Sequence, residues 1–150
     1  MATARAVMIF QEIAYDSDAY RQECALRHQV LRVPLGLSLY AEDLSREDGE
    51  LHFGLFDDGV LVACVIAVAV APAAVKLRQM AVAGGHQRQG HGRTLVGRLE
   101  EYLARRGSVH CTLHARLEAE GFYQKLGYVR RGREFIEVGI AHVCMAKDLA

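Results

Sequence analysis

A chain of 150 residues with 51% hydrophobic and 24% charged residues has the size and composition of an ordinary globular domain, and we expect one domain over residues 1–150. Its 18 lysines and arginines equal its 18 aspartates and glutamates, so the net charge gives no support for nucleic-acid binding. The charge is uneven, however. Lys76 to Arg106 holds seven basic and two acidic residues, a segment toward which an anionic ligand would be steered.

The cysteines and the apolar segments exclude several further classes. The four cysteines are far apart and form no C-x-x-C pair, so we expect free buried thiols, a reducing cytoplasm and neither a zinc ribbon nor a dithiol redox motif. The apolar stretch AVMIF is too short for the core of a signal peptide, and we expect none. The longest apolar run, Val60 to Val75, falls short of the roughly 18 to 20 residues of a membrane-spanning helix and contains a proline, so we predict buried strand there.

The first half of the chain predicts a strand, a helix and a hairpin. Residues 5–14 have a strand pattern, and a helix follows that begins at Asp16 or Ser17 and stops at Pro34. Residues 34–50 are irregular, and their leucines either fill the core or line a pocket. Two apolar runs on either side of Asp57-Asp58-Gly59 predict a hairpin, and residues 73–82 predict a further strand.

The second half alternates helices and strands. Apolar residues at helical spacing predict a helix of about four turns directly after the glycine-rich segment 84–92. A strand over 108–115, a short helix over 116–127 and strands over 128–135 and 141–149 follow. In the short helix, Ala115, Ala119, Phe122 and Leu126 form the expected core face, and Gly127 is the residue expected just past its end. This order predicts an α/β or α+β domain with a mixed sheet.

The segment GGHQRQGHG, residues 84–92, is the strongest candidate for a binding site. It lacks the Lys-Ser/Thr pair that completes a Walker loop, and it lacks the third glycine of the G-x-G-x-x-G dinucleotide motif. Glycines between a strand and a helix nevertheless allow backbone N–H groups to converge at a helix N-terminus, which favours anion binding. A plain glycine turn that caps the helix is the alternative, and the loop alone does not choose between the two.

Two motifs together resemble a known family. Gln87-Arg88-Gln89-Gly90-His91-Gly92 fits the Q/R-x-x-G-x-G/A pattern of the GCN5-related N-acetyltransferase (GNAT) superfamily, after LRQMAV, which is similar to its central strand. About thirty residues later, AEGFYQKLGY is similar to its second signature, A-x-x-F-Y-x-K-x-G-[FY]. The chain departs from the pattern at Gln87, where arginine is common, and at Arg88, where glycine is frequent.

The resemblance implies a fold and a reaction. The fold would be a strongly twisted, mixed sheet of about seven strands flanked by about four helices. The chain would be an acyltransferase that moves an acetyl group from acetyl-CoA directly to a primary amine in a ternary complex, without a metal. The acceptor would be a small-molecule or peptide amine, with no nucleic-acid or membrane partner and a homodimer left open. The resemblance assigns CoA binding to Met80, Val82, Gln87, Arg88, Gln89, Gly90, His91, Gly92 and Arg93.

The resemblance also implies the catalytic residues. Tyr123 would be the general acid, or hydrogen-bond donor, for the departing CoA thiolate, with Phe122 anchoring the helix. Candidates for the general base are His52, His114, Glu134, Glu137 and His142, and we rank Glu134 and His142 first because they lie near the final strands. His110 and His114 would be about 13 Å apart on a strand, too far to share a zinc ion.

Two alternatives stay open at this stage. One is a domain of the same fold that binds CoA as a sensor or interaction module without catalysis. The other is a protein that binds nucleotide phosphates but not CoA. The acidic residues from Glu42 to Asp58 suggest a cationic acceptor, although a solvated acidic loop is the simpler interpretation.

Overall fold

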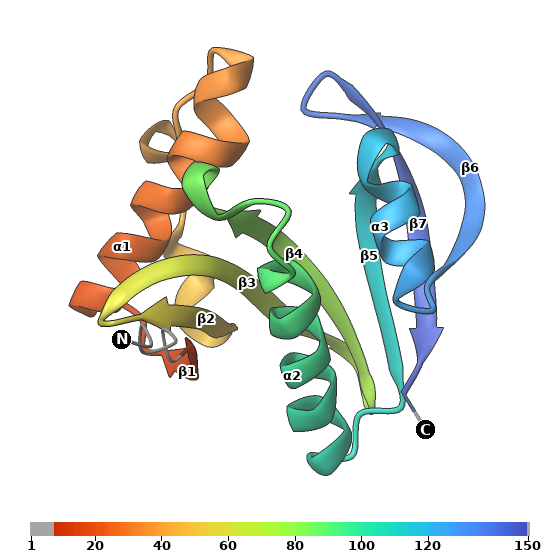
Figure 1. Ribbon diagram of the computed structural model, residues 1–150. Helices are drawn as coiled ribbons and strands as arrows, with labels where there is room; N and C mark the ends of the chain where they lie inside the picture. The colour runs from red at the N-terminus through yellow and green to blue at the C-terminus, as the bar shows by residue number, and fades with distance from the viewer. Residues whose placement is uncertain (1–7, 150) are drawn as a thin grey trace, which may run out of the picture. The chain divides into compact units, whose positions relative to one another are not determined.

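The computed structural model describes residues 8–149, which form two compact units (Figure 1). The N-terminal unit comprises the described residues up to Ile66 together with Gln79–Leu99. The C-terminal unit comprises Ala67–Arg78 together with the described residues from Glu100 onward. The prediction of a single domain stays a prediction.

The N-terminal unit begins with the predicted strand and helix. Strand β1 spans Met8–Ile13, and residues 5–7 of the prediction lie outside the described residues. Helix α1 spans Asp18–Arg27 and is capped by Ser17, whose hydroxyl accepts a hydrogen bond from the Tyr20 N–H at 3.1 Å. The helical path does not stop at Pro34. A π turn (His28–Arg32) and a 3₁₀ turn (Val33–Leu35) continue it, and proline is tolerated in the first turn because its missing N–H is not needed there.

The irregular segment after the helix contains two short 3₁₀ turns, Leu39–Ala41 and Ser45–Gly49. Leu39 is fully buried, whereas Leu37 and Tyr40 are exposed. Ala19 and Leu26 of α1 pack on the core of the unit, a cluster of residues from α1, this segment and the strands: Ile13, Tyr20, Cys24, Leu39, Phe56, Leu61, Cys64 and Ala81.

The predicted hairpin consists of β2 (Leu51–Asp57) and β3 (Val60–Ala71). The two linking residues, Asp58 and Gly59, have φ values of 49° and 79°, as a two-residue type I′ turn requires. β1 pairs with β2 in antiparallel register, Met8 opposite Asp57. Strand β4 (Ala74–Val82), a short turn (Gly84–His86) and helix α2 (His91–Arg105) follow in the predicted order.

The C-terminal unit contains β5 (His110–Arg116), α3 (Glu120–Lys125), β6 (Val129–Glu137) and β7 (Ile140–Asp148). The first half of β4 pairs in parallel with β5, from Ala74 opposite His110 to Leu77 opposite Leu113. β7 pairs antiparallel with both β5 and β6. α3 ends where Gly127 adopts a φ of 97°, so the predicted glycine stop is confirmed.

The seven strands have the order β1-β2-β3-β4-β5-β7-β6. This order has six neighbouring pairs; β4 pairs with β5 in parallel, whereas β1 with β2, β5 with β7 and β6 with β7 are antiparallel, so the sheet is mixed. The prediction of a mixed α/β sheet of about seven strands is therefore confirmed. Among residues 8–149, no helix has both the length and the apolar character needed to cross a membrane.

Candidate functional site

The loop that connects β4 to α2 holds most of the predicted CoA-binding residues. Gln87 and Gln89 brace the loop through their side-chain amides, which donate to the carbonyl oxygens of Val82 at 3.1 Å and Gly85 at 3.3 Å. His91 lies within 3.3 Å of the Gln89 amide oxygen. The loop is thus ordered by its own side chains, and it lies at the surface.

The backbone of this loop turns through two residues in the left-handed region just before α2. Arg88 and Gly90 both have positive φ, 63° and 81°. The Gly90 carbonyl accepts the N–H of Thr94 at 3.0 Å, which is the first bond of α2. The N–H groups of His91, Gly92 and Arg93 therefore precede the bonded ladder of the helix and are available to a ligand. A 15-residue helix with free N–H groups at its start attracts negative charge.

Met80 and Val82 lie on β4 just before the loop. The strand continues through Gln79, although the φ of 56° at this residue is rare for a non-glycine residue inside a strand. The Gln79 main-chain oxygen faces the thiol of Cys64 at 3.9 Å, and its side-chain oxygen is buried without a hydrogen bond. Such a kink takes the main chain of the next residues out of regular strand geometry. Met80 and Val82, the predicted pantetheine contacts, follow it directly.

Tyr123 lies on α3 in the C-terminal unit and is 8% exposed, whereas Phe122 is only partly buried. The expectation that Phe122 is the residue that anchors this helix in the core is wrong, because the larger share of burial falls on Tyr123. Its ring packs edge-on against Phe122 and Tyr128, with ring centroids 4.9 and 5.8 Å away. Burial and the neighbouring Cys111 thiol raise the pKa of the Tyr123 hydroxyl. The phenol therefore keeps its proton at neutral pH, as a proton or hydrogen-bond donor must.

The two first-ranked base candidates lie in different environments. Glu134 is half-exposed on β6 and forms an ion pair with Arg130 at 3.5 Å. His142 is 4% exposed on β7. Its Nδ1 lies 2.8 Å from the Ile140 carbonyl oxygen, which only accepts, so this nitrogen carries a hydrogen. The structure does not bring Glu134 and His142 into contact with each other, and their catalytic role stays a prediction.

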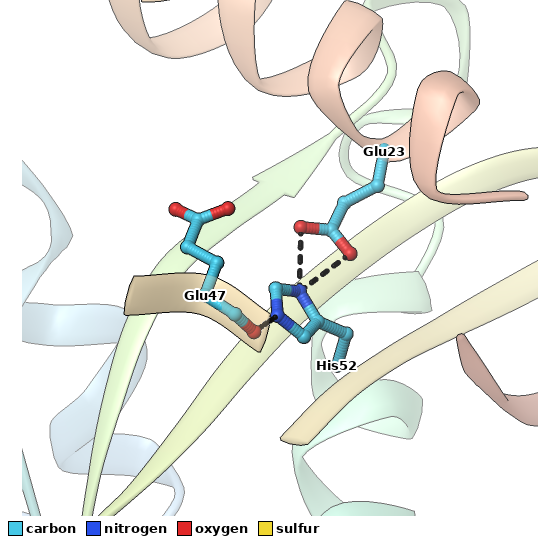
Figure 2. Close-up of side chains that lie close together, drawn as sticks. All are labelled: Glu23, Glu47 and His52. Carbon is cyan, nitrogen blue, oxygen red and sulfur yellow. Dashed lines mark hydrogen bonds and ion pairs between the residues drawn. The ribbon is translucent and has the colours of Figure 1, made fainter. Parts of the chain in front are cut away.

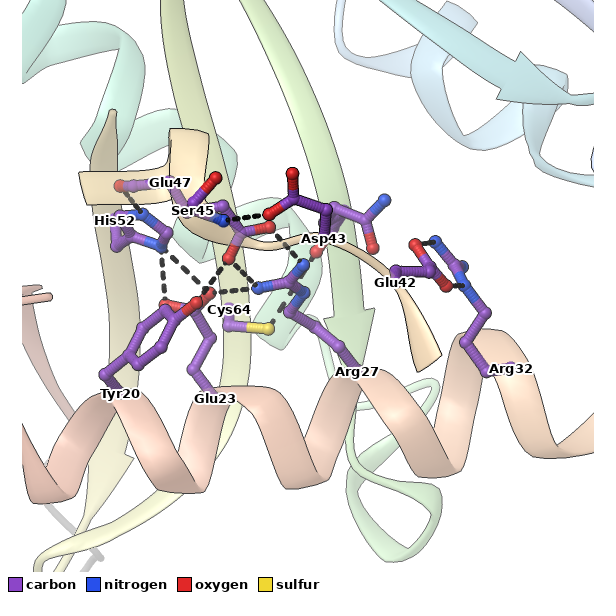
Figure 3. A network of polar contacts seen from close by, with 11 residues as sticks. Tyr20, Glu23, Arg27, Arg32, Glu42, Asp43, Ser45, Glu47, His52 and Cys64 are labelled. Carbon is purple, nitrogen blue, oxygen red and sulfur yellow. Dashed lines mark hydrogen bonds and ion pairs between the residues drawn. The ribbon is translucent and has the colours of Figure 1, made fainter. Parts of the chain in front are cut away.

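A network of buried charges in the N-terminal unit was not predicted (Figures 2 and 3). Arg27 on α1 donates to Glu23 at 2.8 Å and holds both carboxylate oxygens of Glu47 at 2.8 and 2.6 Å. Tyr20 donates its hydroxyl hydrogen to Glu47 at 2.6 Å. All of these side chains are buried. Hydrogen bonds to Arg27 and Tyr20 outweigh the effect of burial and hold the pKa of Glu47 below its ordinary value.

His52 completes this network as a cation. Its Nδ1 lies 2.9 Å from both carboxylate oxygens of Glu23, and its Nε2 lies 2.9 Å from the main-chain oxygen of Glu47 (Figure 2). Both partners only accept hydrogen bonds, so both ring nitrogens carry hydrogens. The pKa of His52 is raised, because its bonds and charges outweigh burial. Ligand atoms of Glu23, Glu47 and His52 lie within 4.8 Å of one another, as in a metal site. Here, however, Arg27 and protonated His52 already balance the two carboxylates.

The same arrangement explains part of the acidic segment. Glu42 is held by Arg32 through bonds of 2.6 and 3.3 Å, and Glu47 by Arg27 (Figure 3). Glu42 and Glu47, two of the acidic residues that suggested a cationic acceptor, therefore hold residues 42–47 against the helical segment through ion pairs. The signal that sequence could have offered is the i, i+4 spacing of Glu23 and Arg27, which is common on solvated helix faces and does not reveal burial.

Comparison with known proteins identifies the family. The sequence profile of the family described as acetyltransferase (GNAT) domain matches residues 18–149. The N-acetyltransferase YitI of Bacillus subtilis (strain 168), itself uncharacterised, is 32% identical over 133 residues, which cover 83% of this chain and 88% of YitI. The uncharacterised protein YyaT of the same strain is 39% identical over 75 residues, so the chain matches only about half of its length, 51%. The chain belongs to the GNAT acetyltransferase family.

Solved structures agree with this assignment. A protein of Lactobacillus plantarum described as a candidate N-acetyltransferase superposes with a TM-score of 0.84 at 25% identity, covering 95% of this chain and 99% of the other. An aminoglycoside 6'-N-acetyltransferase complexed with coenzyme A gives a TM-score of 0.80 at 18% identity, over 95% of this chain and 97% of that one. The second likeness shows the fold alone.

Proposed function

We propose that this chain is a cytoplasmic enzyme that transfers the acetyl group of acetyl-CoA directly to a primary amine. The observation that carries the proposal is the pair of motifs in one GNAT-family chain: QRQGHG at the start of α2 and GFYQKLGY across α3. The similar aminoglycoside acetyltransferase was solved with coenzyme A, which supports the choice of cosubstrate. The acceptor is proposed to be an amine of a small molecule or a peptide.

The loop residues suit the pyrophosphate of CoA. The main-chain N–H groups from Gln87 to Gly92 would bind it, because the left-handed residues Arg88 and Gly90 turn the backbone toward the helix start. A side chain added at Gly90 would meet no protein atom within 4 Å, which leaves room for a ligand. Arg88 and Arg93 would add positive charge. The main chain of Met80 and Val82 would bind the pantetheine arm as an additional strand.

Tyr123 would protonate the leaving thiolate. Its hydroxyl is protonated at neutral pH, as that of any tyrosine of ordinary pKa is, and would donate to sulfur as the C–S bond breaks; the raised pKa makes it a weaker acid and favours the role of hydrogen-bond donor. The acceptor amine needs the opposite help. An alkylamine has a pKa of about 10.4, so freeing its lone pair at pH 7 costs roughly 4 to 5 kcal/mol. Glu134 and His142 stay the bases proposed from sequence.

Ligand binding tests the cosubstrate. Acetyl-CoA is expected to raise the melting temperature of the purified chain, and the shift is expected to grow with the logarithm of its concentration above Kd. ATP is expected to compete weakly, because the loop lacks the lysine and hydroxyl of a Walker site. If neither acetyl-CoA nor another acyl-CoA shifts the melting temperature, the proposal is wrong. Equal competition by ATP would favour a nucleotide-phosphate binder.

A tyrosine variant tests the chemistry. With amines from a panel as acceptors and release of free CoA as the readout, Tyr123→Phe is expected to lower kcat by about 10²- to 10⁴-fold, the usual range for a general acid. Tyr102→Phe is the matched control, because Tyr102 lies on α2 and its hydroxyl bonds to the exposed Arg106. Unchanged turnover in Tyr123→Phe would remove the acid role from this residue. Acetyl-CoA binding without turnover on any amine would indicate a sensor.

A further inference from the structure

Four charged or titratable side chains gather on one face of the sheet in the C-terminal unit. They are Lys76 on β4, His114 on β5, Glu137 on β6 and His142 on β7. The strand register places them on the same face, because Lys76 is opposite Thr112, Phe135 is opposite His142, and Arg116, two residues from His114, is also opposite His142. Four strands thus contribute to one polar cluster.

Glu137 is the centre of this cluster. One of its carboxylate oxygens lies 3.0 Å from His114 Nδ1, and the other lies 3.7 Å from His142 Nε2. Lys76 Nζ lies 3.4 Å from the same His114 nitrogen. Burial raises the pKa of Glu137, but the hydrogen bond from His114 and the positive charges around the carboxylate lower it by more. The net pKa of Glu137 therefore lies below its ordinary value. Glu137 is therefore a carboxylate at neutral pH.

The contact with Glu137 fixes which nitrogen of His114 carries the hydrogen. A carboxylate only accepts, and its 3.0 Å contact is shorter than that of Lys76, so Nδ1 donates to Glu137. The lone pair of neutral His114 is then on Nε2. Among the described residues, no protein group is hydrogen-bonded to Nε2, and the His114 side chain is 28% exposed. A carboxylate-held histidine with an accessible lone pair is the arrangement of a general base.

We propose that His114 Nε2 is the general base that takes a proton from the acceptor ammonium, and that Glu137 is the residue that positions it. This inference rests on the proposed function. His114 is the first residue of β5 past the stretch that pairs with β4. Tyr123 acts from the other face, that of Cys111, a buried residue of β5 that raises the pKa of its hydroxyl.

In the proposed step, acetyl transfer is coupled to proton transfers at His114 and Tyr123. The ammonium gives one proton to His114 Nε2, and Glu137 stabilises the resulting imidazolium. The amine lone pair forms the C–N bond, and the C–S bond breaks with its electron pair leaving on sulfur. Sulfur takes the proton of Tyr123, and the second proton of the new amide nitrogen returns through solvent to the Tyr123 oxygen. His114 releases its proton to solvent, so one proton is lost per acetyl group.

The neighbours of His114 explain why it is preferred over the other candidates. His142 faces Glu137 as well, but its side chain is only 5% exposed, against 28% for His114. Glu134 is engaged by Arg130, which also binds Glu120 at 2.8 Å. Lys76 and Glu137 both lie beside His114 Nδ1, and the carboxylate makes the shorter contact. Among the five candidate bases, only His114 combines an accessible histidine ring with a carboxylate partner.

Turnover of His114→Asn across pH tests the inference. At pH 7, kcat is expected to fall by about 10²- to 10⁴-fold with acetyl-CoA binding unchanged. The loss is expected to shrink as the pH approaches about 10, where the amine loses its proton unaided. His110→Asn is the matched control: it lies on the same face of β5, bonds to Asp148 at 2.9 Å and is 29% exposed. Its turnover is expected to stay within twofold of the unsubstituted chain.

Several results would contradict the base role of His114. Full activity in His114→Asn, or a loss of equal size at every pH, would overturn the base role. If kcat falls at pH 7 and recovers at high pH in His142→Asn, but does not fall in His114→Asn, the general base is His142.

A measurement without turnover separates this inference from the proposed function. The nitrogen NMR shifts of His114 at neutral pH are expected to show hydrogen on Nδ1, and Glu137→Gln is expected to weaken that preference. Hydrogen on Nε2 would refute the pairing even if acetyl transfer is established. Conversely, a chain that binds no acyl-CoA would refute the proposed function and, with it, the base role.

Discussion

At Arg88, the loop has a backbone conformation that favours glycine, although the residue carries a long side chain. Its φ of 63° lies in the left-handed region, which costs an ordinary residue about 1 to 2 kcal/mol. Glycine removes this strain but loses about 0.5 to 1 kcal/mol of conformational entropy on folding. Arg88→Gly is therefore expected to raise the free energy of unfolding, measured with urea, by up to about 1 kcal/mol. Arg88→Ala keeps the strain and is expected to give no increase. Equal gains in both variants would show that charge, not backbone, is the cause.

The sequence predicted the backbone at Arg88 but not the burial of Phe122 and Tyr123. The family pattern, in which glycine is frequent at the position of Arg88, agrees with the left-handed backbone found there. At Phe122 and Tyr123, the helical spacing of apolar residues predicted the wrong buried side chain. The reason is that α3 has only six residues and a 3₁₀ turn, Leu117–Ala119, precedes it. A 3₁₀ turn advances each residue by a larger angle than an α-helix, so the predicted core face rotated.

At the scale of elements, α1 is fastened to the segment that follows it by buried charge. Arg27→Met would leave the carboxylates of Glu23 and Glu47 without their guanidinium, and removal of one partner from a buried ion pair costs about 3 to 5 kcal/mol. We expect a loss of this size in chemical denaturation. Arg21→Met is the control on the same helix, because Arg21 is 63% exposed in its pair with Asp18, and it should change stability by less than about 1 kcal/mol. Similar losses in both variants would contradict a special role for the buried network.

Most elements followed from local pattern, whereas the network did not. The hairpin turn, the cap at Ser17 and the stop at Gly127 depend on residues next to one another in sequence, and each was predicted. The network joins Glu23 to His52 across 29 positions and Arg27 to Glu47 across 20. Nothing in one sequence couples such positions, because each side chain alone fits a solvated surface. The pairing of His114 with Glu137, 23 positions apart, was missed for the same reason.

At the scale of the whole molecule, the registered motifs predicted more than either alone. QRQGHG left a phosphate loop and a plain turn equally open. GFYQKLGY downstream implied the GNAT fold, and the seven-stranded mixed sheet and the family match over residues 18–149 confirm it. The acceptor does not follow from these motifs, because they concern the cosubstrate, and the acidic segment that suggested a cation is partly neutralised by Arg27 and Arg32.

The buried network also makes the stability of the folded chain depend on pH. His52 is held as an imidazolium by Glu23 and the main chain of Glu47, with the Tyr20 ring packed edge-on at 5.4 Å. Because folding raises the pKa of His52, its contribution is complete below the unfolded value of about 6.5 and is lost as the pH rises through the folded value. The free energy of unfolding is therefore expected to fall from pH 6 toward pH 9.

A variant separates this effect from other titrations. His52→Gln retains a hydrogen-bond donor but not the charge, so its stability should be lower at pH 6 and should lack the decline toward pH 9 that His52 causes. Urea denaturation at four or five pH values in this window measures both slopes. A decline of equal size in the variant would assign it to another group, and stability of the unsubstituted chain that rises with pH would mean that His52 is buried as the neutral imidazole. The second result would leave Arg27 to balance the carboxylates of both Glu23 and Glu47.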